Sequence, residues 1–333
     1  MGTSRYIASW IKKILAGLII FIGLQVTGQD FHFTQFYANK LYLAPSFAGA
    51  TEQNRFIINY RNQWPAVNGF VTYSASYDHY FSNFNSGLGI LVMRDMAGDG
   101  KFGPLNLSVH YSYDFSVTED VHIRPGLSLG YLQWSIDYSK FRFSSQIDQS
   151  NNTQSSVDDL GGKSSVGAID GASSVIVYAK NWMAGTSFNH LLRPNKSLLG
   201  NVDQLPLQYS LYGSVTLLRY GRLLKPVDET VTFAYIFKGM SNNVQLDIGL
   251  YWAQIPLTFG IWYRGIPVVN SPIGDSFAVM AGIKRQHFSF GYSYDFTISS
   301  LVNKTAGAHE ISMAYEFAKT KRKKLHAVPC PEF

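Results

Sequence analysis

The sequence predicts an all-β protein, a transmembrane antiparallel β-barrel of about 14 strands. Three observations lead to this fold class. Apolar and polar residues alternate with a period of two along most of the chain after residue 55. Charged residues make up only 15% of the chain, whereas a soluble domain carries about 25%. The 21 Tyr, 23 Phe and 6 Trp are together as numerous as the charged residues, as expected of a wall that faces lipid.

The first 29 residues predict a cleaved secretory signal peptide. Three basic residues precede an apolar run at 14–26, and small residues precede a cut expected near Gln29 or Asp30. The run is shorter than the roughly 20 residues of a spanning helix, which argues against a membrane anchor. The mature chain is therefore expected to be exported across the inner membrane of a Gram-negative cell.

Residues 30–54 predict an irregular segment ahead of the barrel. Residues 30–50 read DFHFTQFYANKLYLAPSFAGA, which is rich in aromatic and turn-forming residues and has no regular period. Such a segment can lie in the periplasm or plug the lumen of the barrel. Both alternatives stay open at this point.

The barrel itself is predicted over residues 55–318. Residues 105–117 alternate strictly, with apolar residues at the odd positions and polar residues at the even ones. The same reasoning predicts strands at 55–64, 70–81, 87–95, 104–117, 121–135, 172–180, 182–190, 207–218, 229–238, 244–253, 257–264, 276–284, 288–299 and 309–317. Most have lengths near the roughly 9–11 residues with which a tilted strand crosses a bilayer.

The lengths of the links give an independent test of this assignment. The links after the second, fourth, sixth, tenth and twelfth strands are short, namely 82–86, 116–120, 181, 254–256 and 285–287. Most links on the other side are longer and include 96–103, 136–171, 191–206, 265–275 and 300–308. This pattern predicts periplasmic turns on one rim, extracellular loops on the other, and both chain ends in the periplasm. The link at 220–228 breaks the rule.

A secreted β-sandwich would also alternate, and it is the alternative fold. A sandwich exposes its charged face, however, whereas the polar positions here are mostly Ser, Thr, Asn, Gly and Gln. Aromatic residues also gather near strand ends, as in the girdles at the two interfaces of a bilayer. These are Tyr60, Trp64, Tyr80, Phe81, Tyr131, Trp134, Trp252, Trp262 and Tyr263.

Residues 319–333 predict a short basic tail on the periplasmic side. The tail holds five positive charges and one negative charge, and the signal peptide holds three positive charges. Residues 30–318 therefore carry a net charge of −1, although the whole chain carries +6. Because the barrel is not basic, a nucleic-acid partner is excluded. The tail suits either anionic lipid headgroups or docking to a periplasmic partner, and its Cys330, the single cysteine, could pair between chains.

No catalytic, cofactor or metal site is predicted. The eight histidines lack ligand spacing, and His110 between Ser108 and Ser112 is interpreted as part of an ordinary polar lumen face. The stretch DMAGDG at 95–100 has oxygen ligands that suit Ca²⁺, but a glycine-rich hairpin loop is the favoured interpretation. Acidic residues expected in the long loop can contact a surface protein or an ion, although solvation explains them more simply; they are Asp148, Asp158, Asp159 and Asp170.

Several motifs occur in a fixed order along the chain. The series opens with DFHFTQFY at 30–37, followed by Asn39, Leu43, Pro45 and the residues at 47–49. It continues with YRNQWP at 60–65, WYRG at 262–265, GYSYDF at 291–296, HEIS at 309–312 and the terminal CPEF. Taken in this order, the motifs resemble the PorP/SprF family, barrel proteins tied to the type IX secretion system of Bacteroidetes.

The resemblance implies a non-enzymatic outer-membrane component that supports export or cell-surface attachment of particular substrates, such as gliding adhesins. The implied partners are type IX secretion components in the periplasm and outer membrane, an exported surface protein or adhesin, and outer-membrane lipid. The candidate partner-binding residues are Phe31, Gln35, Tyr37, Pro45, Phe47, Arg61, Trp64, Lys321, Arg322, Lys323, Cys330 and Phe333. A passive porin or small-solute transporter is the alternative function, and it calls for a water-filled lumen lined by charges.

Overall fold

A single antiparallel sheet forms the body of the protein. The computed structural model describes residues 33–35, 37–51, 53–141, 163–220, 229–266, 276–298, 305–317 and 328–329. Within these ranges the sheet holds fifteen strands. They are β1 (Arg55–Gln63), β2 (Phe70–Phe81), β3 (Ser86–Ala97), β4 (Gly103–Tyr113), β5 (Phe115–Ser116), β6 (His122–Ser135), β7 (Ser165–Ala179), β8 (Trp182–Asn189), β9 (Gln208–Tyr220), β10 (Glu229–Met240), β11 (Asn243–Gln254), β12 (Leu257–Ile266), β13 (Ser276–Arg285), β14 (Phe288–Thr297) and β15 (Ala308–Glu316).

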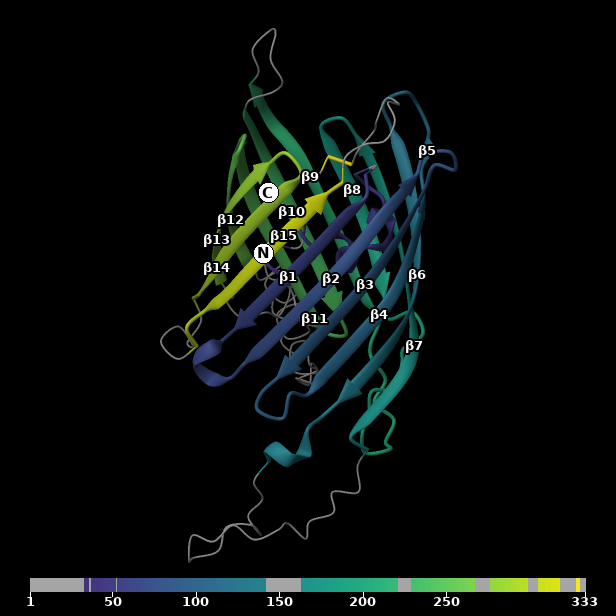
Figure 1. The fold of residues 1–333 in the computed structure, drawn as a ribbon, viewed down its shortest axis with the longest axis vertical. Helices are drawn as coiled ribbons and strands as arrows, with labels where there is room; N and C mark the ends of the chain where they lie inside the picture. Colours follow the sequence, from purple (N-terminus) through teal and green to yellow (C-terminus); the bar gives the residue numbers. More distant parts are fainter. Residues whose placement is uncertain are drawn as a thin grey trace, which may run out of the picture. The chain divides into compact units, whose positions relative to one another are not determined.

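The sheet closes into a barrel of tilted strands (Figure 1). Apart from β4 and β5, each strand pairs with its neighbour in the sequence, and the first strand, β1, pairs with the last, β15, from Arg55↔Glu316 to Gln63↔Ala308. The two-residue β5 continues β4 beyond Asp114, and both pair with β6. The barrel wall therefore consists of fourteen strands when β4 and β5 are counted as one. No strand is left without a neighbour on either side among the described strands, as a sheet in hydrocarbon requires.

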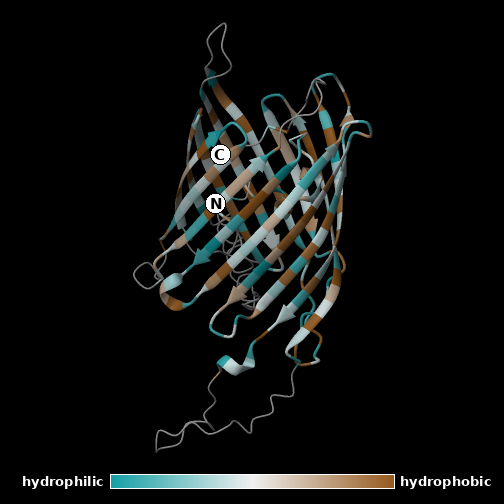
Figure 2. Cartoon of the chain, viewed as in Figure 1, coloured by the Kyte–Doolittle hydropathy of each residue, from teal (hydrophilic) through white to brown (hydrophobic). Residues whose placement is uncertain are grey.

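The barrel is polar inside and apolar outside, the reverse of a soluble domain. In β4, the outward Leu107, Val109 and Tyr111 are 43–53% exposed, whereas the inward His110 and Ser112 are buried. Figure 2 shows the same alternation of hydrophobic and hydrophilic residues along the other strands. The polar side chains of the inner face are covered by other side chains that pack in the lumen, described below. They therefore do not require a water-filled interior for solvation. Among the described residues, no helix is long and apolar enough to span a bilayer.

The two rims of the barrel differ in their links. We call one the short-turn rim; it carries the links 82–85, 117–121, 180–181, 255–256 and 286–287. The opposite long-loop rim carries the links 64–69, 98–102, 136–164 and 190–207, together with the two-residue link 241–242. Two short helical turns lie in these links, η2 (Pro65–Val67) and η3 (Tyr138–Lys140). The exceptional link at 221–228 lies outside the described residues.

The observed strands correspond to the predicted ones. Two strand boundaries and the positions of two tryptophan side chains differ from the prediction. The long loop ends at residue 164 instead of 171, because residues 165–171 pair with β6 although Gly167, Ala168 and Gly171 weaken their alternation. The strand predicted at 104–117 is interrupted at Asp114, whose backbone N–H donates to Asn85. Trp134 and Trp262, expected in the bilayer-facing girdles, are instead buried in the lumen at 4% and 2% exposure. Their positions share the inward parity of neighbouring polar residues.

The hydrophobic core of the protein lies inside the barrel. Two short helices, α2 (Lys40–Leu43) and η1 (Pro45–Phe47), belong to the described residues 33–35 and 37–51, which we call the lumen segment. Its Tyr37 and Phe47 join Tyr178, Tyr212 and Trp262 of the wall in one buried cluster. A second cluster joins its Phe33, Leu41 and Ala48 to Leu91 and Met93 of β3.

Candidate functional site: a segment folded into the lumen

The lumen segment satisfies much of its backbone hydrogen bonding by itself. A chain inside a barrel has little water to bond to, so unpaired N–H and C=O groups are costly. The turns of α2 and η1 pair Ala44 N–H with Lys40 C=O at 3.1 Å and Ala48 N–H with Pro45 C=O at 3.0 Å. Pro45 occupies the first position of η1, where its missing N–H is not needed. The sequence APSF thus ends one turn and starts the next.

One end of the lumen segment is held by Arg61 and two carboxylates of the wall. The Arg61 guanidinium contacts Glu310 Oε2 at 3.0 Å and Asp295 Oδ2 at 2.9 Å. It also donates to Thr34 Oγ1 at 2.7 Å, and the Thr34 hydroxyl donates to Asp295. The backbone N–H groups of Thr34 and Gln35 donate to the two oxygens of Glu310, at 2.8 and 2.9 Å. All five residues are buried, so these charges depend on one another for solvation.

This cluster extends across the barrel as alternating charges. Asp295 also accepts from Arg264 at 2.7 Å, and Arg264 Nε lies 3.9 Å from Asp247. Lys238 Nζ is 3.4 Å from the same Asp247. We call this set the charge network; in order it comprises Glu310, Arg61, Asp295, Arg264, Asp247 and Lys238. Its charges sum to zero, which makes its burial physically acceptable.

The Gln35 side chain adds three hydrogen bonds to β14 and β15. Its amide nitrogen donates to Ser293 Oγ at 3.1 Å and to the Glu310 carbonyl at 3.2 Å, while its amide oxygen accepts from Ser312 Oγ at 2.5 Å. On the other side, the Tyr37 hydroxyl donates to the Gly213 carbonyl on β9 at 2.9 Å. The segment therefore bonds to opposite parts of the wall.

The other end of the lumen segment is held near the short-turn rim. The Ala48 carbonyl accepts from Arg124 at 2.8 Å and from Ser112 Oγ at 2.7 Å. The Gly49 N–H donates to Asp78 Oδ2 at 3.0 Å, and the other oxygen of Asp78 accepts from Arg55 Nε at 3.1 Å. These contacts fix the point at which the chain leaves the lumen to start β1.

Two wall glycines allow the segment to approach this closely. A Cβ added at Gly87 would collide with the Ala48 carbonyl, and one added at Gly126 would collide with the backbone of Ser46. Both collisions are with backbone, which cannot rotate away as a side chain can. Glycine is therefore required at both positions for the lumen segment to stay in place.

A piece of the C-terminal tail also lies in the lumen. The Val328 N–H donates to the Ala50 carbonyl at 3.1 Å, and Ser214 Oγ donates to the Pro329 carbonyl at 3.2 Å. Val328 is 5% exposed and belongs to the same buried cluster as Tyr37 and Phe47. Parts of the chain that follow and precede the barrel therefore meet inside it.

The structure brings five of the candidate partner-binding residues together. Gln35, Tyr37, Pro45, Phe47 and Arg61 are all buried at the boundary between the lumen segment and the wall. In this conformation each of these side chains is therefore covered by other parts of the same chain.

The other candidates lie elsewhere. Trp64 lies apart at the long-loop rim, where it adopts a left-handed φ of 61° and packs edge-on against Phe70. Six further candidates lie outside the described residues, namely Phe31, Lys321, Arg322, Lys323, Cys330 and Phe333.

The sequence reasoning did not select the remaining members of the charge network. Asp295, Glu310 and Arg264 belong to motifs that the sequence contains, but no residue-level role was assigned to them. Lys238 and Asp247 belong to none of those motifs. One signal was available: in a chain with few charges, an ionisable residue at an inward strand position needs a partner across the lumen.

Among the described residues, no group of His, Cys, Asp or Glu side chains is arranged to hold a metal ion. Of the four acidic residues expected in the long loop, the structure describes one. Asp170 lies in β7 with an oxygen 2.6 Å from His190 Nδ1, and Asp148, Asp158 and Asp159 lie outside the described residues. The DMAGDG stretch covers the end of β3 and the start of the 98–102 link to β4, where Asp99 accepts from Asn68 at 2.9 Å.

His110 and Ser108 form a close pair on the lumen wall. Ser108 Oγ and His110 Nε2 lie 2.9 Å apart, and both residues are buried. A nucleophile and base of this kind need a third group that orients the imidazole. Among the described residues, none bonds to His110 Nδ1.

A closed antiparallel barrel with an apolar outer wall and a polar, internally bonded lumen defines an outer-membrane β-barrel protein. The chain belongs to the PorP/SprF family: the family model described as type IX secretion system membrane protein PorP/SprF matches residues 25–315. No curated protein sequence matches the chain.

Solved structures of other barrels are similar to this chain at low identity. Omp33 of Acinetobacter baumannii is 8% identical, with 80% of this chain and 100% of that chain covered and a TM-score of 0.44. The toluene transporter TodX of P. putida is 11% identical, with 83% and 93% covered and a TM-score of 0.45. The KdgM porin is 12% identical, with 79% and 99% covered and a TM-score of 0.38.

Proposed function

We propose that this protein is a non-enzymatic, partner-binding component of the outer-membrane stage of type IX secretion. It supports export or cell-surface attachment of a limited set of exported proteins, such as gliding adhesins. The observation that carries the proposal is the occupied lumen: the lumen segment bonds through Thr34 and Gln35 at one end and through Ala48 and Gly49 at the other. A barrel filled in this way suits protein binding at its rims better than diffusion of solutes through its centre.

We further propose an orientation for the barrel. The short-turn rim and both chain ends face the periplasm, and the long loops face the exported protein, as is usual for outer-membrane barrels. Residues 1–29 are removed on export, which the intact mass of the purified protein would report. The basic residues 319–324 then lie within reach of periplasmic secretion components and of the inner-leaflet headgroups of the outer membrane.

A deletion strain tests the proposal directly. Surface proteins and culture fluid from the deletion strain and its complemented parent would be compared by mass spectrometry. We expect a few large exported proteins to leave the surface fraction while the bulk of the outer-membrane proteins stays unchanged. If every large surface protein stays in place and folded, the proposed role is wrong.

Ion conductance separates this function from that of a passive porin or small-solute transporter. The purified protein would be inserted into planar lipid bilayers. We expect little conductance from the wild-type protein, because the lumen segment occupies the path. A large, stable open channel in the wild-type protein would favour the porin instead.

A further inference from the structure

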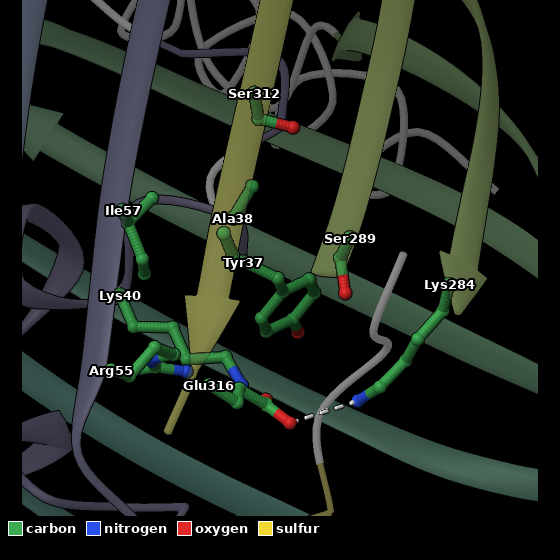
Figure 3. A pocket seen from close by; sticks show the side chains of 10 residues that line it. Tyr37, Ala38, Lys40, Arg55, Ile57, Lys284, Ser289, Ser312 and Glu316 are labelled. Carbon is green, nitrogen blue, oxygen red and sulfur yellow. Dashed lines mark ion pairs between the residues drawn. The ribbon is translucent and has the colours of Figure 1, made fainter. Parts of the chain in front are cut away.

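A pocket between the lumen segment and the wall is too small for a protein partner. Its volume is about 40 Å³, against the roughly 10–15 Å³ that one water needs. Figure 3 shows this pocket beside the ion pair in which Lys284 Nζ lies 3.5 Å from Glu316. Because the lumen is occupied in this way, a polypeptide partner is expected to bind at a rim of the barrel.

On the long-loop rim, β7 reaches well beyond the end of β8. The two strands pair only over residues 173–179 of β7, whereas β7 starts at Ser165. At His190 the chain takes a left-handed φ of 60° and leaves the sheet, and Asp170 holds His190 through a contact of 2.6 Å. Figure 1 shows the teal start of β7 reaching further down than β1 and β2. Residues 165–169, which we call the β7 edge, therefore have β6 on one side and no strand on the other among the described residues.

Hydrogen bonds at the start of β7 show which way its backbone groups point. The Ile136 N–H, next to β6, donates to the Ser164 C=O at 3.0 Å. The Lys163 N–H instead donates to the Leu198 C=O of the 190–207 link at 2.8 Å. Successive residues of an antiparallel strand direct their N–H and C=O groups to opposite sides. Even-numbered residues at the start of β7 therefore face β6, and odd-numbered residues face away from it.

The same alternation holds beyond the other end of the β7 edge, where the odd-numbered Gly171 accepts from the Leu191 N–H at 3.0 Å. The N–H and C=O groups of Ser165, Gly167 and Ile169 thus point to the side without a strand. Within the described ranges, no backbone group on that side bonds to them. All three residues are exposed, and the exposed surface of Gly167 is backbone because glycine has no side chain.

The β7 edge lacks the features that keep other polypeptides from pairing with an exposed strand. Its sequence, SVGAI, holds no charged residue and no proline. Ile169 is 61% exposed on the outer side, while Val166 packs on the inner side against the buried cluster that contains Trp134 and Leu205. The ligand that matches this edge is an extended segment with an uncharged, apolar sequence.

We propose that the β7 edge is the docking site for an extended strand of the exported protein. This assignment rests on the proposed function and names the contact through which the partner is held. The strand runs antiparallel to β7 in the place that β8 leaves empty, and it pairs with the backbone groups of Ser165, Gly167 and Ile169. Backbone pairing supplies affinity, and apolar side chains beside Ile169 and Val166 supply selectivity.

Hydrogen exchange of the purified protein in detergent micelles tests whether the edge is open. We expect the amides of Gly167 and Ile169 to exchange about tenfold faster, or more, than those of Val166 and Ala168, which face β6. Equal protection of all four amides would mean that another part of the same chain covers the edge, and it would overturn the proposal.

Ile169→Pro tests the pairing itself. The substitution removes an N–H that β6 does not use and places a ring where the partner strand would lie, whereas Ile169→Ala keeps the N–H. Heat-dependent gel migration checks that both variants fold. We expect the proteins that the deletion strain loses from its surface to be lost in Ile169→Pro as well, and to stay in Ile169→Ala. If the deletion strain loses them and Ile169→Pro keeps them, the docking site is wrong and the proposed function stands. If the deletion strain loses none, the proposed function itself fails.

A photo-crosslinker identifies the occupant without requiring the proline variant to fold. Ile169→p-benzoylphenylalanine would be made in living cells, with Val175→p-benzoylphenylalanine as the matched control. Val175 is 39% exposed on the same strand but is paired with Thr186 of β8. We expect position 169, and not position 175, to form an adduct with one of the proteins that the deletion strain loses. An adduct with a second copy of this chain, or no adduct at all, would overturn the proposal.

Discussion

Arg61 connects β1, the lumen segment and the last two strands of the barrel. Its guanidinium is shared between two buried carboxylates and the Thr34 hydroxyl. A buried carboxylate that loses its cation remains in a medium of low dielectric, which is why breaking such a pair costs about 3–5 kcal/mol. The effect of Arg61 on stability therefore comes mainly from the penalty that its removal would impose on Glu310 and Asp295.

We predict that Arg61→Met releases the lumen segment before it unfolds the barrel. Asp295 keeps Arg264 as a partner, whereas Glu310 loses its guanidinium contact. Limited proteolysis of folded protein should then cleave within residues 33–51 while the strands stay protected. Arg219→Met is the control, because Arg219 is exposed and its guanidinium donates to the neutral Asn181 at 3.3 Å. An uncut lumen segment in Arg61→Met would contradict the prediction.

Tyr37→Phe should have a much smaller effect than Arg61→Met. The substitution removes one neutral hydrogen bond to Gly213 and keeps the edge-on contact with Tyr251, whose ring centroid is 6.4 Å away. A bond of this kind contributes about 0.5–1.5 kcal/mol. Urea titration should therefore show a small loss in the free energy of unfolding, with the lumen segment still resistant to protease. A loss as large as that of Arg61→Met would show that the hydroxyl has a further role.

At the scale of elements, the lumen segment depends on bare backbone in β3 and β6. We predict that Gly126→Ala displaces the segment, because the new methyl group would occupy the place of the Ser46 backbone. Single-channel recordings should show higher conductance than the wild type, with the heat-dependent gel shift of a folded barrel unchanged.

Gly171→Ala is the matched control for this variant. A Cβ at Gly171 would meet only the Ser128 carbonyl at an ordinary 3.4 Å. We expect its conductance to equal that of the wild type. If Gly126→Ala conducts no better than Gly171→Ala, the lumen segment is not what limits ion flow.

The strands were predictable from the sequence because each has one face toward lipid and one toward the lumen. Where that contrast fades, the prediction failed: β7 begins at Ser165, seven residues before its predicted start, since Gly167 and Gly171 carry no side chain to show the alternation. The position of the lumen segment was not predictable in the same way. Its residues have no period, and its place is set by contacts with wall residues such as Glu310, 275 residues away from Gln35.

The candidate site was predictable in part for the same reason. Arg61 and Gln35 were chosen through motifs, and the structure brings them to the same carboxylate, Glu310. Their acidic partners look like ordinary inward positions in the sequence. Only the closure of the barrel brings β1, β14 and β15 together and makes the charges of these strands one network.

At the scale of the whole molecule, stability depends on an apolar outer wall. Leu129 lies in the middle of β6, is 63% exposed and pairs with Val109 of β4 on one side and Gly171 of β7 on the other. We predict that Leu129→Arg lowers the free energy of unfolding in lipid vesicles by about 2–4 kcal/mol, because a cation at the bilayer midplane destabilises the barrel by that amount. Urea titration in vesicles measures it.

Phe84→Arg is the control, because Phe84 is also exposed, at 70%, but lies in the turn between β2 and β3. There the cost should fall to about 0–1 kcal/mol, since the cation reaches the interface. Equal losses for the two variants would mean that the outer face is not in contact with lipid at the height of Leu129.

The pairing of β1 with β15, which closes the barrel, also sets the order of the last folding steps. Thr34 precedes β1 in the sequence, yet its N–H donates to the Glu310 carboxylate on β15, 276 residues later. These bonds form only after the last strand has been delivered and paired, which makes docking of the lumen segment a late, high-contact-order step of folding. A barrel stalled before that step would leave residues 33–51 open to proteases.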